Sequence, residues 1–197
     1  MATNFVLIEL MDPEINSLLW DITEILSGRR PKLPVHLTIR GPYDGPVPKA
    51  ILERCRTILK YDVMRIAGVG RFSNPQEEVV FLRVDSPHLR DVWWKPDYRV
   101  SQHGFEPHVS LYRGHDRKFA DVAAEFLRRE KIDLLCAEYQ LVSRRPRQLD
   151  LFYGVAPRST RLTRLTNTGR VVPRILGRLR ELVAEYQRRH ECSITSE

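Results

Sequence analysis

The chain has 197 residues, 42% of them hydrophobic and 29% charged, which suits one domain or two small lobes that share a core. No apolar run approaches the roughly 18 residues that a membrane span needs, and the first residues lack the basic segment of an export signal. The three cysteines, Cys55, Cys136 and Cys192, offer neither a disulfide framework nor a closely spaced metal-binding pair. We therefore expect a globular protein of the cytoplasm, with no membrane partner.

The net charge of +7 is unevenly distributed along the chain. Residues 156–197 contain nine arginines and four glutamates, a net charge of +5, whereas the rest of the chain carries only +2. This distribution fits a polyanionic partner such as RNA or a nucleotide. It fits equally well a soluble protein whose surface is merely basic.

Hydrophobic spacing predicts alternating strands and helices. A strand is expected at 4–10, followed by a helix over 13–26 that Asp12 caps and Gly28 ends. The next elements are a strand at 35–41, a helix at 47–61, and strands at 62–72 and 77–85 around a turn at 73–76. They are followed by a short helix at 86–94, a loop at 95–106, a strand at 107–113 and a helix at 116–130. Two strands at 133–144 and 147–155, joined by a hairpin around Arg145-Pro146, close the series.

The order of the elements occurs twice along the chain, and some of the corresponding residues are similar. A shift of 74 residues places Phe5-Val6-Leu7-Ile8 on Val79-Val80-Phe81-Leu82, and a shift of 72 places His36-Leu37-Thr38-Ile39 on His108-Val109-Ser110-Leu111. We therefore predict an α+β fold of duplicated strand–helix–strand–helix–strand units, with antiparallel sheets flanking a central cleft. The lobes would span about 1–72 and 77–155, and an exchange of strands between them stays open.

The last part of the chain differs from this bilobal domain of residues 1–155. Residues 156–172 read as a basic linker and residues 173–197 as a C-terminal helical extension. The apolar stripe of this helix either packs on a lobe or mediates dimerisation, so the oligomeric state stays open. Gly68 and Gly70 predict a bulge or turn in their strand.

The repeated motif places a histidine and a hydroxyl residue on one face of each strand, because residues i and i+2 point the same way. His36 and Thr38 form one pair, and His108 and Ser110 form the other. Two imidazoles with an ordinary pKa near 6.5 can act as general acid and general base on a phosphodiester, while the hydroxyls bind its oxygens. No carboxylate cluster accompanies either histidine, so we expect neither a metal nor another cofactor. For a single such histidine a structural role is the better interpretation, but the symmetric pair favours catalysis.

At these residues the chain resembles the two-histidine (2H) phosphoesterases, and within them the bacterial 2′-5′ RNA ligase / RNA 2′,3′-cyclic phosphodiesterase family. The likeness covers about residues 4–155 and includes Gly68-Val69-Gly70-Arg71-Phe72. It implies a bilobal α+β fold with His36, Thr38, His108 and Ser110 as a catalytic quartet. It also implies metal-independent hydrolysis of 2′,3′-cyclic phosphates or 2′-5′ linkages, commonly leaving a 2′-phosphate, with RNA ligation as a reverse reaction. In such enzymes the first histidine often protonates the leaving group and the second activates the nucleophile, but the roles can swap.

The chain departs from that pattern at Arg40-Gly41-Pro42-Tyr43 and in residues 156–197, which leaves the substrate open. Two alternative functions stay open: a non-catalytic RNA-binding module on the same fold, and an enzyme that degrades cyclic-oligonucleotide signals.

Simple alternation along the strands adds candidate substrate-binding residues. It places Arg40 and Tyr112 on the catalytic face, where Arg40 can hold a phosphate oxygen, and turns Arg113 away. Tyr98 or Phe105 can stack on a base, while Trp94 is expected in the core and His103 on the surface.

Overall fold

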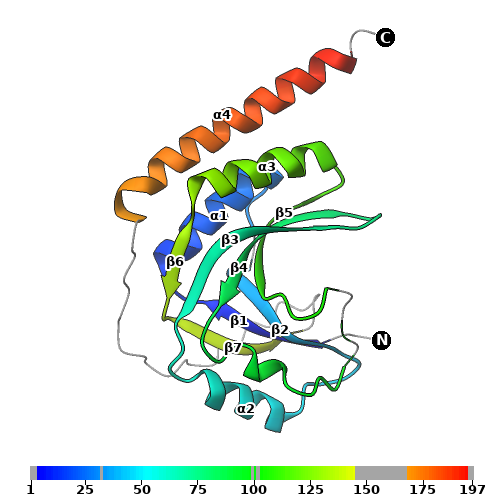
Figure 1. The fold of residues 1–197 in the computed structure, drawn as a ribbon, viewed down its shortest axis with the longest axis vertical. Helices are drawn as coiled ribbons and strands as arrows, with labels where there is room; N and C mark the ends of the chain where they lie inside the picture. The colour runs from blue at the N-terminus through cyan, green and yellow to red at the C-terminus, as the bar shows by residue number, and fades with distance from the viewer. Residues whose placement is uncertain (1–3, 32, 99, 101–102, 145–167, 195–197) are drawn as a thin grey trace.

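The computed structural model describes residues 4–31, 33–98, 100, 103–144 and 168–194. These residues form an α+β fold of two antiparallel sheets, one of them curled into a half-barrel, with a C-terminal helix (Figure 1). The strands are β1 (Asn4–Leu10), β2 (His36–Tyr43), β3 (Met64–Ser73), β4 (Glu78–Asp85), β5 (His108–Gly114), β6 (Asp133–Cys136) and β7 (Tyr139–Arg144). The helices are α1 (Pro13–Ser27), α2 (Lys49–Leu59), α3 (Arg117–Glu130) and α4 (Thr168–Ile194), with one 3-10 turn, η1 (Asp91–Trp93).

The two sheets divide the strands unequally. One has the order β2-β1-β7 and the other the order β5-β4-β3-β6, so that β2 and β5 each lie at an edge. Helix α3 packs on β3 and β4, α1 packs against β5, and α2 contacts β7 and η1. The strands that carry the two histidines are thus edge strands, and each pairs with an inner strand of its own sheet.

The expected start and stop signals of the first helix are confirmed. The Asp12 carboxylate accepts hydrogen bonds from the backbone N–H groups of Glu14 and Ile15, at 2.9 and 3.0 Å. Gly28 ends the helix with φ of +70°, a conformation that glycine adopts without steric cost. Asp116 caps α3 in the same way, accepting from the N–H of Phe119 at 2.9 Å.

Two sequence-based assignments are wrong in detail. Residues 133–144 do not form one strand: β6 pairs with β3 and β7 pairs with β1, so the chain passes from one sheet to the other at residues 137–138. The helix expected at 86–94 is reduced to turns and the three residues of η1. The strand expected at 147–155, its hairpin around Arg145-Pro146 and the basic linker up to residue 167 lie outside the described residues.

The glycines of β3 form the expected irregularity. The pairing of β3 with β4 shifts between Ile66 and Val69, and Gly68 has φ of +76°. A Cβ atom on Gly70 would lie 2.2 Å from the Phe81 ring, so only glycine leaves room for that ring at this position.

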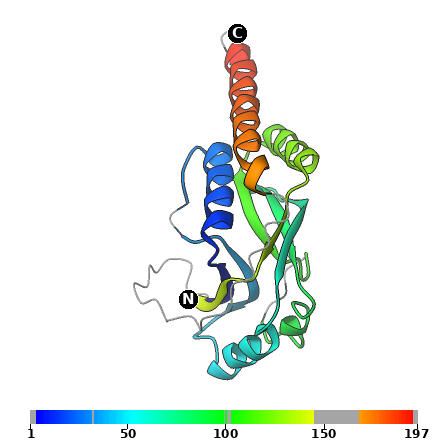
Figure 2. The same ribbon diagram turned by 90° about the vertical axis from the view of Figure 1, so that its left-hand side faces the viewer.

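Helix α4 packs on the body of the protein, the first of the two arrangements that its apolar stripe allowed. It contacts α1 and α3, and Ile175, Leu176 and Leu179 are buried. The Tyr186 hydroxyl donates to the Asp116 carboxylate at 2.8 Å, and the helix projects beyond the body after this contact (Figure 2). Among the described residues, no helix combines the length and the apolar character that crossing a membrane would require.

Candidate functional site

The two His-x-Ser/Thr motifs lie at the start of two strands that approach each other. His36 begins β2, His108 begins β5, and these edge strands contact one another where the two sheets adjoin. Both histidines and Ser110 are partly buried, and Thr38 is exposed. The fold therefore brings two segments that are 72 residues apart in sequence to one junction, with polar side chains accessible on each.

Both imidazoles are held by the same kind of hydrogen bond. The Nδ1 atom of His36 lies 2.9 Å from the carbonyl oxygen of Pro34, and the Nδ1 atom of His108 lies 2.7 Å from that of Glu106. A carbonyl oxygen can only accept, so Nδ1 donates in both rings. In the neutral form of each ring the lone pair is then on Nε2, the nitrogen left to exchange a proton with a ligand.

The two strands also share an irregularity at the same point of the motif. Each has one extra residue directly after the hydroxyl residue, Ile39 in β2 and Leu111 in β5. The flanking pairs are Leu7–Thr38 and Val6–Arg40 in one sheet, and Phe81–Ser110 and Val80–Tyr112 in the other. A β-bulge of this kind reverses which face the following side chains occupy.

His108 is partly buried against two aromatic rings. The Phe81 ring lies 4.7 Å and the Phe72 ring 5.0 Å from the imidazole, centroid to centroid, and His103 stacks on Phe72 at 4.3 Å. Burial lowers the pKa of His108 below its ordinary value of 6.5. His108 is therefore neutral at pH 7, the state in which Nε2 can accept a proton. Phe72, which contacts His108, was not predicted from the sequence as part of the site.

We expect the lowered pKa of His108 to be measurable by NMR. The Cε1 proton of His108 should titrate with a midpoint below 6.5. Because the unfolded chain binds this proton at higher pH than the folded chain, His108 lowers the unfolding free energy as the pH falls below about 6.5. The variant His108→Asn should remove that part of the acid sensitivity. A midpoint at or above 6.5 would contradict the argument.

Arg40 does not occupy the face that alternation predicted. Its side chain is 4% exposed, and its guanidinium donates to the Tyr43 hydroxyl at 2.9 Å and to the Asp97 carboxylate at 2.6 Å. It also donates to the backbone carbonyls of Val92 and Trp94, at 2.6 and 3.3 Å. With its donors used inside the protein, Arg40 anchors the loop at 92–97 rather than a phosphate. The bulge at Ile39 is the physical reason, because it turns Arg40 away from the face of Thr38.

The expectations for Tyr112 and Arg113 are reversed for the same reason. Tyr112 is buried, its ring packed on Phe119 at 5.2 Å. Arg113, which alternation turned away, has its Nη2 atom 3.4 Å from the Ser110 hydroxyl and its Nη1 atom 3.0 Å from the Glu77 carboxylate. Arg113 is thus the cation beside the second motif. The position of Arg113 could not be predicted from a single sequence, because no residue type marks where the β-bulge occurs.

The two aromatic candidates lie in other contacts. Tyr98 packs against Tyr43 at 5.3 Å and under the Arg40 guanidinium at 5.2 Å, and burial raises its pKa to about 12. Phe105 stacks on Trp93 at 5.3 Å. The expectation that Trp94 lies in the core is wrong, since its side chain is 53% exposed.

Comparison with known proteins adds no identification. No family model matches the sequence, and neither a curated protein nor a solved structure shows significant similarity to it. The chemistry of the site rests on its own geometry.

The two motifs and their neighbours supply a proton acceptor, a second imidazole, two hydroxyls and a cation. Neutral His108 can take a proton at Nε2, and His36 presents the equivalent nitrogen from the other sheet. Ser110, Thr38 and Arg113 can donate hydrogen bonds to an anion. In the part of the chain that the structure describes, no group of three or more histidine, cysteine or acidic side chains is placed to hold a metal ion.

Proposed function

We propose that the protein is a metal-independent phosphodiesterase that hydrolyses 2′,3′-cyclic phosphate or 2′-5′ phosphodiester bonds of RNA or small nucleotides. The observation that carries the proposal is the matched pair of histidines. Each is fixed through Nδ1 to the carbonyl two residues before it, each is followed by a hydroxyl residue and a bulge, and the two strands contact each other. A structural histidine has no need of such a partner, whereas acid–base chemistry at one phosphorus needs two.

The lowered pKa of His108 supports a division of roles. His108 Nε2 takes the proton of a water molecule as its oxygen attacks the phosphorus of a 2′,3′-cyclic phosphate. The bond between phosphorus and the 3′ oxygen breaks, and His36 donates a proton to that leaving oxygen. The products are a 2′-phosphate and a 3′-hydroxyl. Thr38, Ser110 and Arg113 stabilise the charge on the non-bridging oxygens. Ligation, the reverse reaction, exchanges the roles of the two histidines.

The same proposal includes a duplicated fold around a central cleft. The pairing of β1 with β2 matches that of β4 with β5, and each half places its later strand in the other sheet, β3 beside β4 and β7 beside β1. Helix α1 contacts β5 as η1 contacts β2. These correspondences support two units that exchange strands, with His36 and His108 as equivalent residues across the cleft.

A substrate panel tests the proposal. The protein is incubated in EDTA with each of four substrates: RNA ending in a 2′,3′-cyclic phosphate, 2′-5′ oligoadenylate, cyclic nucleotides, and ADP-ribose cyclic phosphate. The position of the phosphate in each product is determined by NMR. We expect turnover of an RNA end or a 2′-5′ linkage, with a bell-shaped pH profile. Cleavage of cyclic oligonucleotides alone would favour the signal-degrading alternative. RNA binding that weakens with salt, without turnover of any substrate, would replace the enzyme by a binding module.

A further inference from the structure

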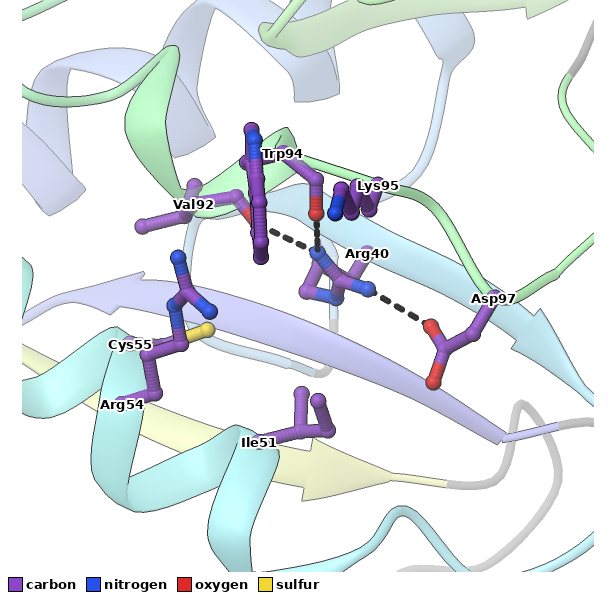
Figure 3. A pocket seen from close by; sticks show the side chains of 8 residues that line it. All are labelled: Arg40, Ile51, Arg54, Cys55, Val92, Trp94, Lys95 and Asp97. Atoms are coloured by element: carbon purple, nitrogen blue, oxygen red, sulfur yellow. Dashed lines mark hydrogen bonds and ion pairs between the residues drawn. The ribbon is translucent and has the colours of Figure 1, made fainter.

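A pocket lies between α2 and the loop at 92–97, among residues that the proposed reaction does not use (Figure 3). Ile51, Cys55 and Val92 supply apolar walls, and Arg54, Trp94 and Lys95 line it as well. The Arg40–Asp97 ion pair completes the lining, so the one carboxylate of the pocket is already neutralised by a buried arginine. The hollow itself has a volume of about 110 Å³ and opens to solvent. This is less than the roughly 300–1,000 Å³ of a site that encloses a whole small molecule, so the pocket holds only part of a ligand.

Trp94 combines a large exposed ring with two neighbouring cations. The indole stands between Arg54, whose guanidinium carbon is 4.5 Å from the ring centroid, and Lys95, whose ammonium is 4.4 Å from it (Figure 3). Within the described residues, no carboxylate pairs with either cation. An exposed tryptophan flanked by positive charge favours a ligand that brings both a planar ring and an anion.

The loop that presents Trp94 is anchored by hydrogen bonds to one side chain. The buried Arg40 guanidinium accounts for this, because it binds the carbonyls of Val92 and Trp94 and the Asp97 carboxylate at once. Lys95 adopts a positive φ of 43°, uncommon for a residue with a side chain. A tryptophan on an anchored backbone loses less conformational entropy on binding a ligand than one on an unanchored loop.

We propose that this pocket is a second, non-catalytic nucleotide-binding site. The nucleobase stacks on the Trp94 indole in place of one of the two cations, and Arg54 and Lys95 bind the phosphate. The base then covers the apolar surface of Ile51 and Val92. The ligand is either a free mononucleotide or one unit of a single-stranded RNA, and the site stands whether or not the histidine pair is catalytic.

Binding measurements test the site with the full-length chain. Fluorescence anisotropy with labelled hexa-adenylate RNA and calorimetry with AMP are compared for the wild type, Trp94→Ala and Arg54→Glu. We expect Trp94→Ala to weaken binding at least fivefold, the lower bound for the loss of one stacked base. Arg54→Glu should weaken it further at low salt and reduce the salt dependence of hexa-adenylate binding. The double variant His36→Ala/His108→Ala should still bind at this pocket.

Tyr61 provides the matched control. Its ring is 84% exposed and lies 5.0 Å from the Lys60 ammonium, so it is an aromatic–cation pair that does not line the pocket. Tyr61→Ala should bind as the wild type does, and all variants should keep the thermal unfolding midpoint of the wild type. Binding of both probes assigns a mononucleotide site, and binding of the RNA alone assigns a strand site. The proposal is overturned if neither probe binds, if Trp94→Ala binds like Tyr61→Ala, or if hexaglutamate competes as well as RNA does.

Discussion

Replacing either His36 or His108 with alanine is expected to lower the rate of phosphodiester hydrolysis by about 10²–10⁴-fold while the fold is kept. The two residues lie at the starts of edge strands and are only partly buried, so their removal leaves the core of each sheet intact. Because each variant keeps one of the two proton-transfer groups, the pH profile should lose one limb: the acid limb without His108 and the alkaline limb without His36.

Steady-state rates on the best substrate of the panel, measured from pH 5 to 9, provide the test. His115→Ala is the matched control, since this exposed histidine follows β5 directly and lies outside the motif. Thr38→Ala and Ser110→Ala should reduce the rate and keep both limbs of the profile, because the hydroxyls bind the phosphate and transfer no proton. Full activity in both single histidine variants would remove the catalytic proposal.

Arg40→Ala is expected to destabilise the protein by about 3 kcal/mol, within the range for the loss of one partner of a buried ion pair. The variant removes four hydrogen bonds at once and leaves the Val92 carbonyl without its donor in a buried position. The Asp97 side chain is 46% exposed, so water takes over part of its charge and keeps the loss at the lower end of that range.

Urea unfolding followed by circular dichroism measures this effect. Arg65→Ala is the control, because Arg65 also binds a carboxylate through two nitrogens, Asp133 at 2.9 and 2.7 Å, but does so in solvent. That variant should unfold nearly as the wild type does. If Arg40 instead held a phosphate oxygen, Arg40→Ala would reduce activity and leave the urea midpoint unchanged. Arg40→Lys should also lose stability, since one ammonium cannot reproduce the planar fork.

Local signals in the sequence were sufficient for most of the elements. Asp12 and Gly28 mark the ends of α1 because capping depends on neighbouring residues alone. Residues 133–144 show the limit of this reasoning. Their apolar pattern suits a strand throughout, but the partners β3 and β1 belong to different sheets, and nothing local to the segment records where the chain changes partner.

Simple alternation predicted which face of its strand a side chain occupies only up to the first β-bulge. Up to Thr38 and Ser110, alternation placed the histidine and the hydroxyl residue of each motif correctly on one strand. Beyond them the bulges at Ile39 and Leu111 reverse the faces, which moves Arg40 and Tyr112 into the interior and brings Arg113 beside Ser110. A bulge arises from the pairing of two strands, so the amino-acid sequence of one strand does not reveal it.

The sequence by itself determined the two His-x-Ser/Thr motifs, the class of fold and the boundaries of most helices and strands, because these depend on residue type and short-range spacing. Tertiary structure alone decided that β2 and β5 meet, that Arg40 holds a loop, and that this loop presents Trp94 to solvent. These features depend on contacts between segments about 50 to 70 residues apart. Such contacts form only when the whole chain has packed.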